Sequence, residues 1–205
     1  FSGTSTMFRC QATGCSTAGA FITTGLHFGC VANANTITGF SSGIGYNFCL
    51  SYANSGASSD GFSFNAATSV INCTSYNNGR YGFRGIITGI VLINCVAETN
   101  ATSDFFLDAS SINCMILNCA GVTTNISAAS KLLYIGFITG TAEFFTTPGS
   151  GDFSLNTLAG GGAALRGAGY PGVMLGGLTT GYTDIGVWQR NNAIVPPSGY
   201  TSFVG

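Results

Sequence analysis

The chain has 205 residues and a formal net charge of −1 at pH 7, and only 6% of its residues are charged although 45% are hydrophobic. Globular proteins carry about 25% charged residues, so neutral polar residues and 31 glycines must form most of this surface. The absence of a Lys/Arg cluster argues against nucleic acid or an anionic membrane as partner, and no apolar run reaches the roughly 18–20 residues that span a bilayer. Without an initial methionine or a leader pattern, we expect Phe1 to begin either a processed product or part of a longer chain.

A short motif recurs along the chain. The stretch INCTSYNN at 71–78 returns as INCVAETN at 93–100 and more loosely as LNCAGVTT at 117–124. Repeats of 20–25 residues that are rich in turn formers are typical of a solenoid, in which each unit buries its apolar face by stacking on its neighbours. The motif cysteines, at spacings of 20, 19, 24, 22 and 24 residues, are Cys10, Cys30, Cys49, Cys73, Cys95 and Cys119.

The pattern inside each unit indicates β-strands. Residues alternate with period two, so that Ile71, Cys73 and Ser75 share one face. We therefore expect the cysteine and the residue two positions before it to point into one core; those residues are Phe8, Phe28, Ile71, Ile93 and Leu117, with Asn47 as the exception. Further along each unit, a glycine precedes a phenylalanine at 39–40, 61–62 and 82–83, and Asp104-Phe105 follows the same pattern. This predicts a phenylalanine stack beside glycines with positive φ.

Five residues after the cysteine, an asparagine recurs. Because asparagine tolerates left-handed backbone and identical amides about 4.8 Å apart can hydrogen-bond to each other, we predict an asparagine ladder at a corner. Its members are Asn35, Asn54, Asn78 and Asn100.

These units, over residues 8–124, resemble the right-handed, single-stranded parallel β-helix of pectate-lyase-like and phage-tailspike-like proteins. The stretch from DFSL to DIG within 151–189 resembles the C-terminal closing segment of secreted or virion-borne β-helix proteins, with short strands beginning at Asp152 and Asp184. The resemblance implies an all-β solenoid of about six or more coils. We expect coils over 1–130, the last coils and closing segment over 131–190, and an extended arm or linker over 191–205.

The cysteines favour a reduced, stacked ladder, because side chains in register on parallel strands suit the disulfide dihedral poorly. Inter-coil disulfides are the alternative, and Cys15 and Cys114 either pair elsewhere or remain free. No CxxC pair occurs and His27 is the only histidine, so we expect no metal site, no cofactor and a core or surface role for His27.

Few residues are candidates for chemistry. Asp104, Asp108 and Glu98 are the weak catalytic candidates, since glycan-cleaving β-helix enzymes need convergent carboxylates. Counted by unit, Asp104 and Asp108 fall one coil beyond Arg80 and Arg84, which suggests either a shared site or inter-coil salt bridges. The aromatic candidates for glycan stacking are Tyr52, Tyr76 and Tyr81.

Two functions follow from these observations. The first is a non-enzymatic extracellular or virion-associated structural or adhesive solenoid that self-associates into a fibre or phage-tail-like appendage, either head to tail or through its arm. The alternative is a glycan-binding or glycan-cleaving protein such as a tailspike, with a surface glycan as partner. Low charge and the lack of a catalytic cluster favour the structural function.

Overall fold

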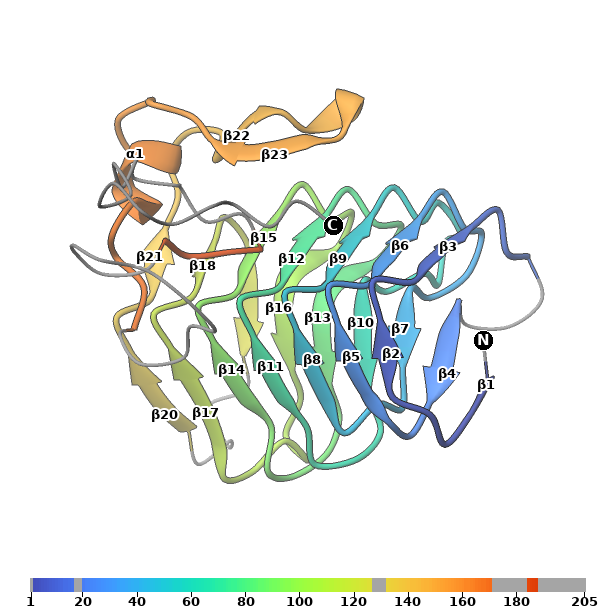
Figure 1. Ribbon diagram of the computed structural model, residues 1–205. Coiled ribbons are helices and arrows are strands. Elements are labelled where there is room, and N and C mark those ends of the chain that lie inside the picture. Colours follow the sequence, from blue (N-terminus) through green and yellow to red (C-terminus); the bar gives the residue numbers. More distant parts are fainter. Residues whose placement is uncertain (1, 17–19, 127–131, 171–183, 188–205) are drawn as a thin grey trace, which may run out of the picture.

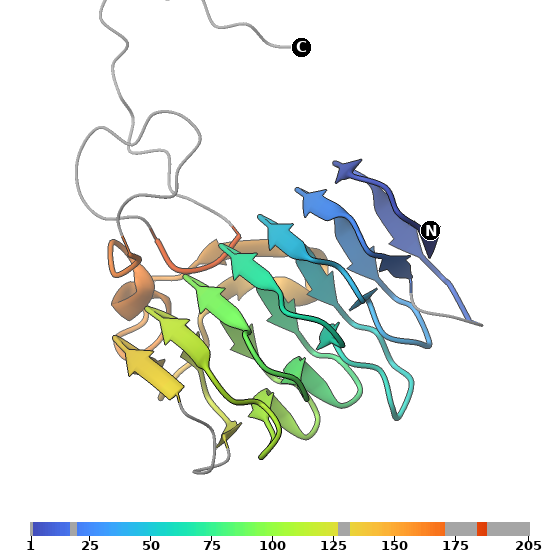
Figure 2. The same cartoon turned by 90° about the horizontal axis from the view of Figure 1, so that it is seen from below.

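The computed structural model describes residues 2–16, 20–126, 132–170 and 184–187. Over these residues the chain forms three parallel sheets, each of seven strands, in which every strand pairs with its counterparts in the neighbouring coils. Figure 1 shows the coils stacked in chain order from the blue N-terminal end, and the turned view in Figure 2 shows the same order. The parallel β-solenoid predicted from the repeat is confirmed.

Sheets A, B and C take one strand each from every coil. Sheet A contains β1 (Ser2–Gly3), β4 (Phe21–Thr23), β7 (Phe40–Ser41), β10 (Phe62–Phe64), β13 (Tyr81–Gly85), β16 (Ser103–Leu107) and β19 (Thr124–Ile126). Sheet B contains β2 (Met7–Phe8), β5 (Leu26–Phe28), β8 (Gly45–Asn47), β11 (Ser69–Ile71), β14 (Val91–Ile93), β17 (Cys114–Leu117) and β20 (Leu132–Ile135). Sheet C contains β3 (Gln11–Thr13), β6 (Val31–Asn33), β9 (Leu50–Tyr52), β12 (Thr74–Tyr76), β15 (Val96–Glu98), β18 (Ala120–Gly121) and β21 (Ile138–Thr139).

The interior consists of columns of like side chains. On sheet A the predicted phenylalanine stack is confirmed: Phe21, Phe40, Phe62, Phe83 and Phe105 are buried, with successive ring centroids 4.8, 4.8, 4.9 and 5.1 Å apart. These distances match the spacing of hydrogen-bonded strands, so sheet pairing itself sets the ring stacking. All eight cysteines are free thiols, and the column from Cys30 to Cys119 is buried.

His27 lies in this interior. It is fully buried, its ring stacks on Tyr46 at 4.9 Å, and Thr23 Oγ1 lies 2.8 Å from its Nε2. Burial lowers the pKa of the imidazole, because the charged form loses its hydration in an apolar site. A neutral core histidine is therefore favoured at neutral pH.

At the corner between sheets B and C, the side chains of sheet B point to the opposite face from the one predicted. The residue before each motif cysteine is left-handed; these residues are Arg9, Gly29, Phe48, Asn72, Asn94 and Asn118. Such a residue bends the chain at the corner and interrupts the period-two alternation. The expectation that Ile71 and Cys73 share a face was therefore wrong. Val70 points inward and is fully buried, whereas Ile71 lies on the outer surface and is half-buried.

Backbone conformation at two other repeated positions also differs from expectation. The left-handed residues at the next corner are Ala34, Ala53, Asn77 and Thr99, each directly before a ladder asparagine. The glycines before the phenylalanines, at 39, 61 and 82, lack positive φ. They are required for space, because a Cβ on Gly61 would collide with Ser75 Oγ and lie 2.7 Å from the carbonyl oxygen of Gly82.

The C-terminal part covers the outer face of sheet C. We call residues 140–170 and 184–187 the covering segment; it contains β22 (Phe145–Thr147), the short helix η1 (Pro148–Ser150), β23 (Asp152–Leu155) and α1 (Gly162–Leu165). The β22–β23 hairpin is antiparallel and lies along sheet C above β15, β12 and β9 (Figure 1). A second core joins outward residues of sheet C to the covering segment; it contains Leu50, Val96, Ala120, Phe144, Phe145, Phe153, Leu155, Leu165 and Ile185.

The predicted closing strands are right in one case. A strand does begin at Asp152, but it pairs in the hairpin and does not continue the stack. Asp184 begins no strand; residues 185–187 form a bend in which the amide of Gly186 donates to the Asn94 carbonyl at 2.8 Å. The predicted arm, 191–205, lies outside the described residues.

Candidate functional site

The asparagine side chains form a continuous hydrogen-bonded row. Nδ2 of Asn35, Asn54 and Asn78 each donates to Oδ1 of the next asparagine, at 2.8, 2.7 and 2.9 Å. The row ends at Asp104, whose Oδ1 accepts from Asn100 Nδ2 at 2.8 Å. Each amide donor thus has an acceptor one coil further on, which is how a fully buried polar column is tolerated.

Asp104, a catalytic candidate from the sequence, is fully committed to this row. It is completely buried, and its Oδ2 accepts the backbone amides of Val122 and Thr123, both at 2.9 Å. A carboxylate with such partners terminates the ladder by supplying acceptors to donors that would otherwise be unsatisfied. This geometry gives Asp104 a structural role.

Asp108 and the arginines do not form a site with Asp104. The strand register pairs Arg84 with Phe106 and Phe83 with Phe105, an offset of 22 residues, whereas Asp104 and Asp108 lie 24 residues beyond Arg80 and Arg84 and so miss the register by two positions. Arg80 instead forms two hydrogen bonds of 2.7 Å with Asp60 in the preceding coil. Asp108 lies in a turn, where its Oδ1 accepts the amide of Ser110 at 2.9 Å. An inter-coil salt bridge is present, but it joins Arg80 to Asp60 and not to the predicted partners Asp104 and Asp108.

The three candidate tyrosines fall on two different surfaces. Tyr52 and Tyr76 lie in register on the outer face of sheet C, and Phe153 of the hairpin packs against both, with ring centroids 5.0 and 5.7 Å away. They anchor the covering segment. Tyr81 lies on sheet A, half-buried, where its ring stacks on Phe106 at 4.4 Å with the Arg80 guanidinium 5.1 Å from its centroid.

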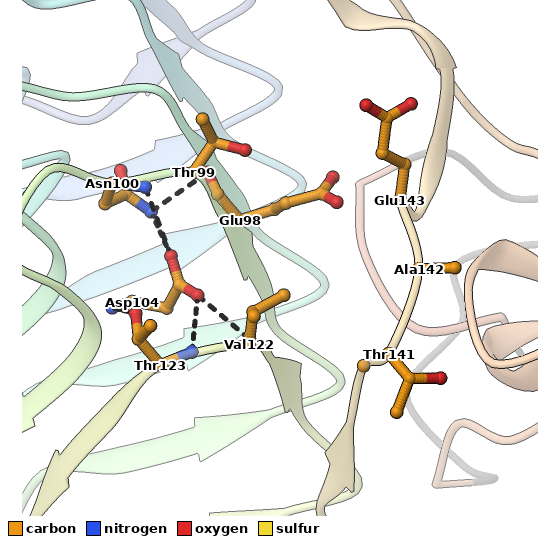
Figure 3. Close-up of a pocket in the computed structure, with 10 residues that line it drawn as sticks. Glu98, Thr99, Asn100, Asp104, Val122, Thr123, Thr141, Ala142 and Glu143 are labelled. Carbon is orange, nitrogen blue, oxygen red and sulfur yellow. Dashed lines mark hydrogen bonds between the residues drawn. The ribbon is translucent and has the colours of Figure 1, made fainter.

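Glu98 lies in a pocket of about 340 Å³ between sheet C and the start of the covering segment. It continues the register of Tyr52 and Tyr76 at the end of β15 and is 4% exposed. Its Oε1 accepts the amide of Phe144 at 3.0 Å, whereas its Oε2 is buried without a hydrogen-bond partner. Figure 3 shows the Glu98 carboxylate extending toward the chain that carries Thr141 and Glu143.

The electrostatics of this pocket are unfavourable to a charged Glu98. Burial raises the pKa of its carboxyl to about 7, with further contributions from Glu143 and Asp104, against the opposing hydrogen bond from Phe144. Sequence reasoning selected Glu98 but missed Glu143, which is brought to it across a separation of 45 residues by docking of a segment outside the repeat.

The outer face of sheet B was also missed. We call its outward side chains the sheet B surface; they form two columns with no charged residue, and the strands that carry them lie side by side in Figure 1. Phe8, Leu133 and Ile135 are 65%, 51% and 51% exposed. The apolar members are Phe8, Leu26, Phe28, Ile71, Val91, Ile93, Met115, Leu117, Leu133 and Ile135, of which Leu117 is buried. The available signal was the apolar residue two positions before each cysteine, which the sequence analysis had assigned to the interior.

Comparison with protein-family models, curated proteins and solved structures finds no match for this chain. Arguments about its function therefore rest on its own geometry. In the part of the chain that the structure describes, three or more His, Cys, Asp or Glu side chains nowhere form a group suited to a metal ion. Within the same residues, no helix has both the length and the apolar character needed to cross a membrane.

Proposed function

We propose that this protein is a non-enzymatic structural β-solenoid that associates with further copies of itself through the sheet B surface. The observation that supports this is an uncharged surface across the seven strands of sheet B, apolar on every strand except β8, where the outward residues are Gly45 and Asn47, and with Phe8, Leu133 and Ile135 at least half exposed. Contiguous apolar patches on soluble proteins typically mark interaction sites. A second copy fits this strip because its side-chain columns repeat with the same spacing of about 4.8 Å and bring no charge that would need a counter-charge.

The dimensions of the strip predict the strength of the association. Seven strands of about three residues span roughly 30 by 10 Å, which is well below the ~800 Å² per partner of a standard stable interface. We therefore expect weak, concentration-dependent association that becomes strong only when many copies assemble. Head-to-tail and arm-mediated contacts remain predictions from the sequence.

We further propose an extracellular or virion-associated location and kinship with pectate-lyase-like and tailspike-like β-helix proteins. Support comes from the three-sheet parallel solenoid and from a surface built of neutral polar residues. The arrangement of the acids weighs against glycan cleavage, since Asp104 terminates the ladder and Asp108 holds a turn.

The experiment is a comparison of two isoleucine-to-lysine variants by sedimentation velocity and negative-stain microscopy over a concentration series. Ile93→Lys places a charge on the sheet B surface, and Ile22→Lys places one on a half-buried outward position of sheet A. We expect Ile93→Lys to weaken association by about tenfold or more, or ~1.4 kcal/mol, and Ile22→Lys to leave it unchanged. Equal association of both variants and the wild type would refute the assignment to sheet B.

Glycan binding is the second candidate, and one region favours it. A pocket of about 280 Å³ is lined by Thr36, Thr38, Ser58 and Ser59, among others, and Ser59 Oγ is buried without a hydrogen-bond partner. The Ser59 carbonyl accepts the amide of Arg80, the residue before the stacked Tyr81, so this aromatic residue is in the coil next to the pocket although it is not part of the lining. Hydroxyls beside an aromatic ring suit a neutral sugar. Binding on a glycan array that disappears in Tyr81→Ala would support this candidate, and absence of binding by the wild type would remove it.

A further inference from the structure

The Glu98 pocket combines unbalanced negative charge with an unsatisfied oxygen. Its lining includes the three acids Glu98, Asp104 and Glu143 and no basic side chain. Asp104 already accepts hydrogen bonds from four N–H donors of Asn100, Val122 and Thr123. Glu98 and Glu143 have no comparable set, and Glu98 is nine-tenths buried with Oε2 lacking any partner.

The oxygen donors that line this pocket are all hard. Besides the carboxylates, the side chains of Thr99, Thr123 and Thr141 contribute hydroxyls, and the lining contains neither imidazole nor thiol. Carboxylate, hydroxyl and carbonyl oxygens with water are the ligands of Ca²⁺ and Mg²⁺, whereas Zn²⁺ prefers nitrogen and sulfur. Glu143 is exposed and can adjust its position, which suits the flexible coordination of Ca²⁺ better than the strict octahedron of Mg²⁺.

We propose that Glu98 and Glu143 bind a divalent cation of the calcium type that ties the covering segment to sheet C. Glu98 supplies Oε2 from the end of β15, Glu143 supplies its carboxylate from the facing chain, and water and threonine hydroxyls complete the shell. The ion neutralises two like charges that line the same pocket from the two docked segments. This site is independent of self-association through the sheet B surface, which lies on a different sheet.

The ion has a structural consequence that calorimetry can detect. Phe144 donates its amide to Glu98 and is itself buried in the second core, so fixing the Glu98 carboxylate also fixes the start of the hairpin. A cation that binds only the docked state stabilises it in proportion to its concentration relative to its Kd. Calcium sites of extracellular modules have Kd values of roughly 10⁻⁴–10⁻³ M, so we expect stabilisation at millimolar calcium.

The test measures the melting temperature of the chelator-treated protein at pH 8 with CaCl₂, MgCl₂ or NaCl at matched ionic strength. We expect calcium to raise it by several degrees, magnesium to raise it less and sodium to leave it unchanged. Glu98→Gln and Glu143→Gln should each lower calcium affinity by about tenfold or more. Asp152→Asn is the matched control. It removes one carboxylate from the covering segment, which also carries Glu143, but Asp152 is not part of the pocket lining.

Terbium luminescence locates the ion. Tyr76 lies in register with Glu98, one strand away. Burial raises the pKa of its hydroxyl, and the charges of Glu98 and Glu143 raise it further, so the ring is close to the proposed ion. Tb³⁺ excited through tyrosine should emit in the wild type, lose the signal on addition of calcium, and emit less in Tyr76→Phe and Glu98→Gln.

Three outcomes would overturn the proposal. In the first, calcium does not change the melting temperature of the wild type. In the second, calcium raises the melting temperatures of Glu98→Gln and Asp152→Asn equally, and in the third Tyr76→Phe leaves the Tb³⁺ emission unchanged. Glu143→Gln keeps the test usable if Glu98→Gln does not fold, because Glu143 is exposed.

Discussion

The outer faces of sheets B and C carry similar apolar columns but differ in what covers them. On sheet C, Leu50, Val96 and Ala120 are buried beneath the chain's own covering segment. On sheet B, Leu133 and Ile135 are each 51% exposed although their strand continues the same stack. Because burial of apolar area contributes roughly 25 cal/mol per Å², the covered face stabilises the monomer, whereas the open face can contribute only through association.

The covering segment follows a repeated feature of the solenoid. Asn118 Nδ2 donates to the Ala168 carbonyl at 2.7 Å, and Asn94 Nδ2 donates to the Tyr170 carbonyl at 3.2 Å. These asparagines occupy the left-handed corner position before the cysteine. The motif residue therefore serves two purposes in these coils: it permits the turn, and it offers an amide to the segment that covers sheet C.

The largest predicted effect comes from removing the anchor of the covered face. Phe153 is 1% exposed and packs against Tyr52, Tyr76 and Phe145, so Phe153→Ala should lower the free energy of unfolding by about 3–5 kcal/mol. Phe8→Ala on the open face, where the ring is 65% exposed, should cost less than about 1 kcal/mol. Urea unfolding of both variants measures this difference, and equal losses would show that the two faces do not differ as described.

The next largest loss of stability is expected at Asp104, which ends the asparagine ladder beside sheet C. Asp104→Asn turns an amide toward the N–H groups of Val122 and Thr123 and should destabilise the protein by about 2–4 kcal/mol. Asp108→Asn, in its turn, should cost less than about 1 kcal/mol. Equilibrium unfolding at pH 7 provides the measurement. A near-neutral Asp104→Asn would mean that the ladder does not need an anionic end.

The sequence predicted the solenoid and the phenylalanine stack because the repeat period and the Phe spacing are written directly in it. The facing of Ile71 was predicted wrongly because the left-handed residue at Asn72 interrupts the alternation. The asparagine that recurs before the cysteine marks this corner, but the period-two pattern was continued through it. The partnership of Glu98 with Glu143 was inaccessible from the sequence, since it depends on where a non-repeating segment docks. Periodicity thus predicts what stacks, and tertiary docking decides what remains uncovered.

The inward side of sheet B offers a pH-dependent contrast with its outward side. The pKa of His27 is lowered by burial, so the unfolded chain takes up a proton below about pH 6.5 before the folded chain does. Stability should therefore fall as pH drops below 6.5, by no more than about 1 kcal/mol down to pH 5.5. The neighbouring Tyr46 stays protonated, because burial raises the pKa of its hydroxyl.

The free energy of unfolding of the wild type and of His27→Phe should be compared at pH 7.5 and 5.5, so that the effects of the seven acids cancel. The variant should lose less stability between these two pH values than the wild type does. An unchanged pH dependence would mean that the imidazole is not held neutral in the core.

The smallest expected effect concerns the open face itself. Leu133→Ser replaces a side chain that is 51% exposed, so in dilute solution it should change the free energy of unfolding by no more than about 1 kcal/mol. Leu155→Ser, at a leucine that is 5% exposed in the second core, should cost about 2–5 kcal/mol. Urea midpoints measured at low and high protein concentration distinguish folding from association. The wild type should become more stable than Leu133→Ser only at high concentration, where copies associate. A large loss for Leu133→Ser in the dilute monomer would show that sheet B is already covered within one chain, and the difference between the two faces would then have to be abandoned.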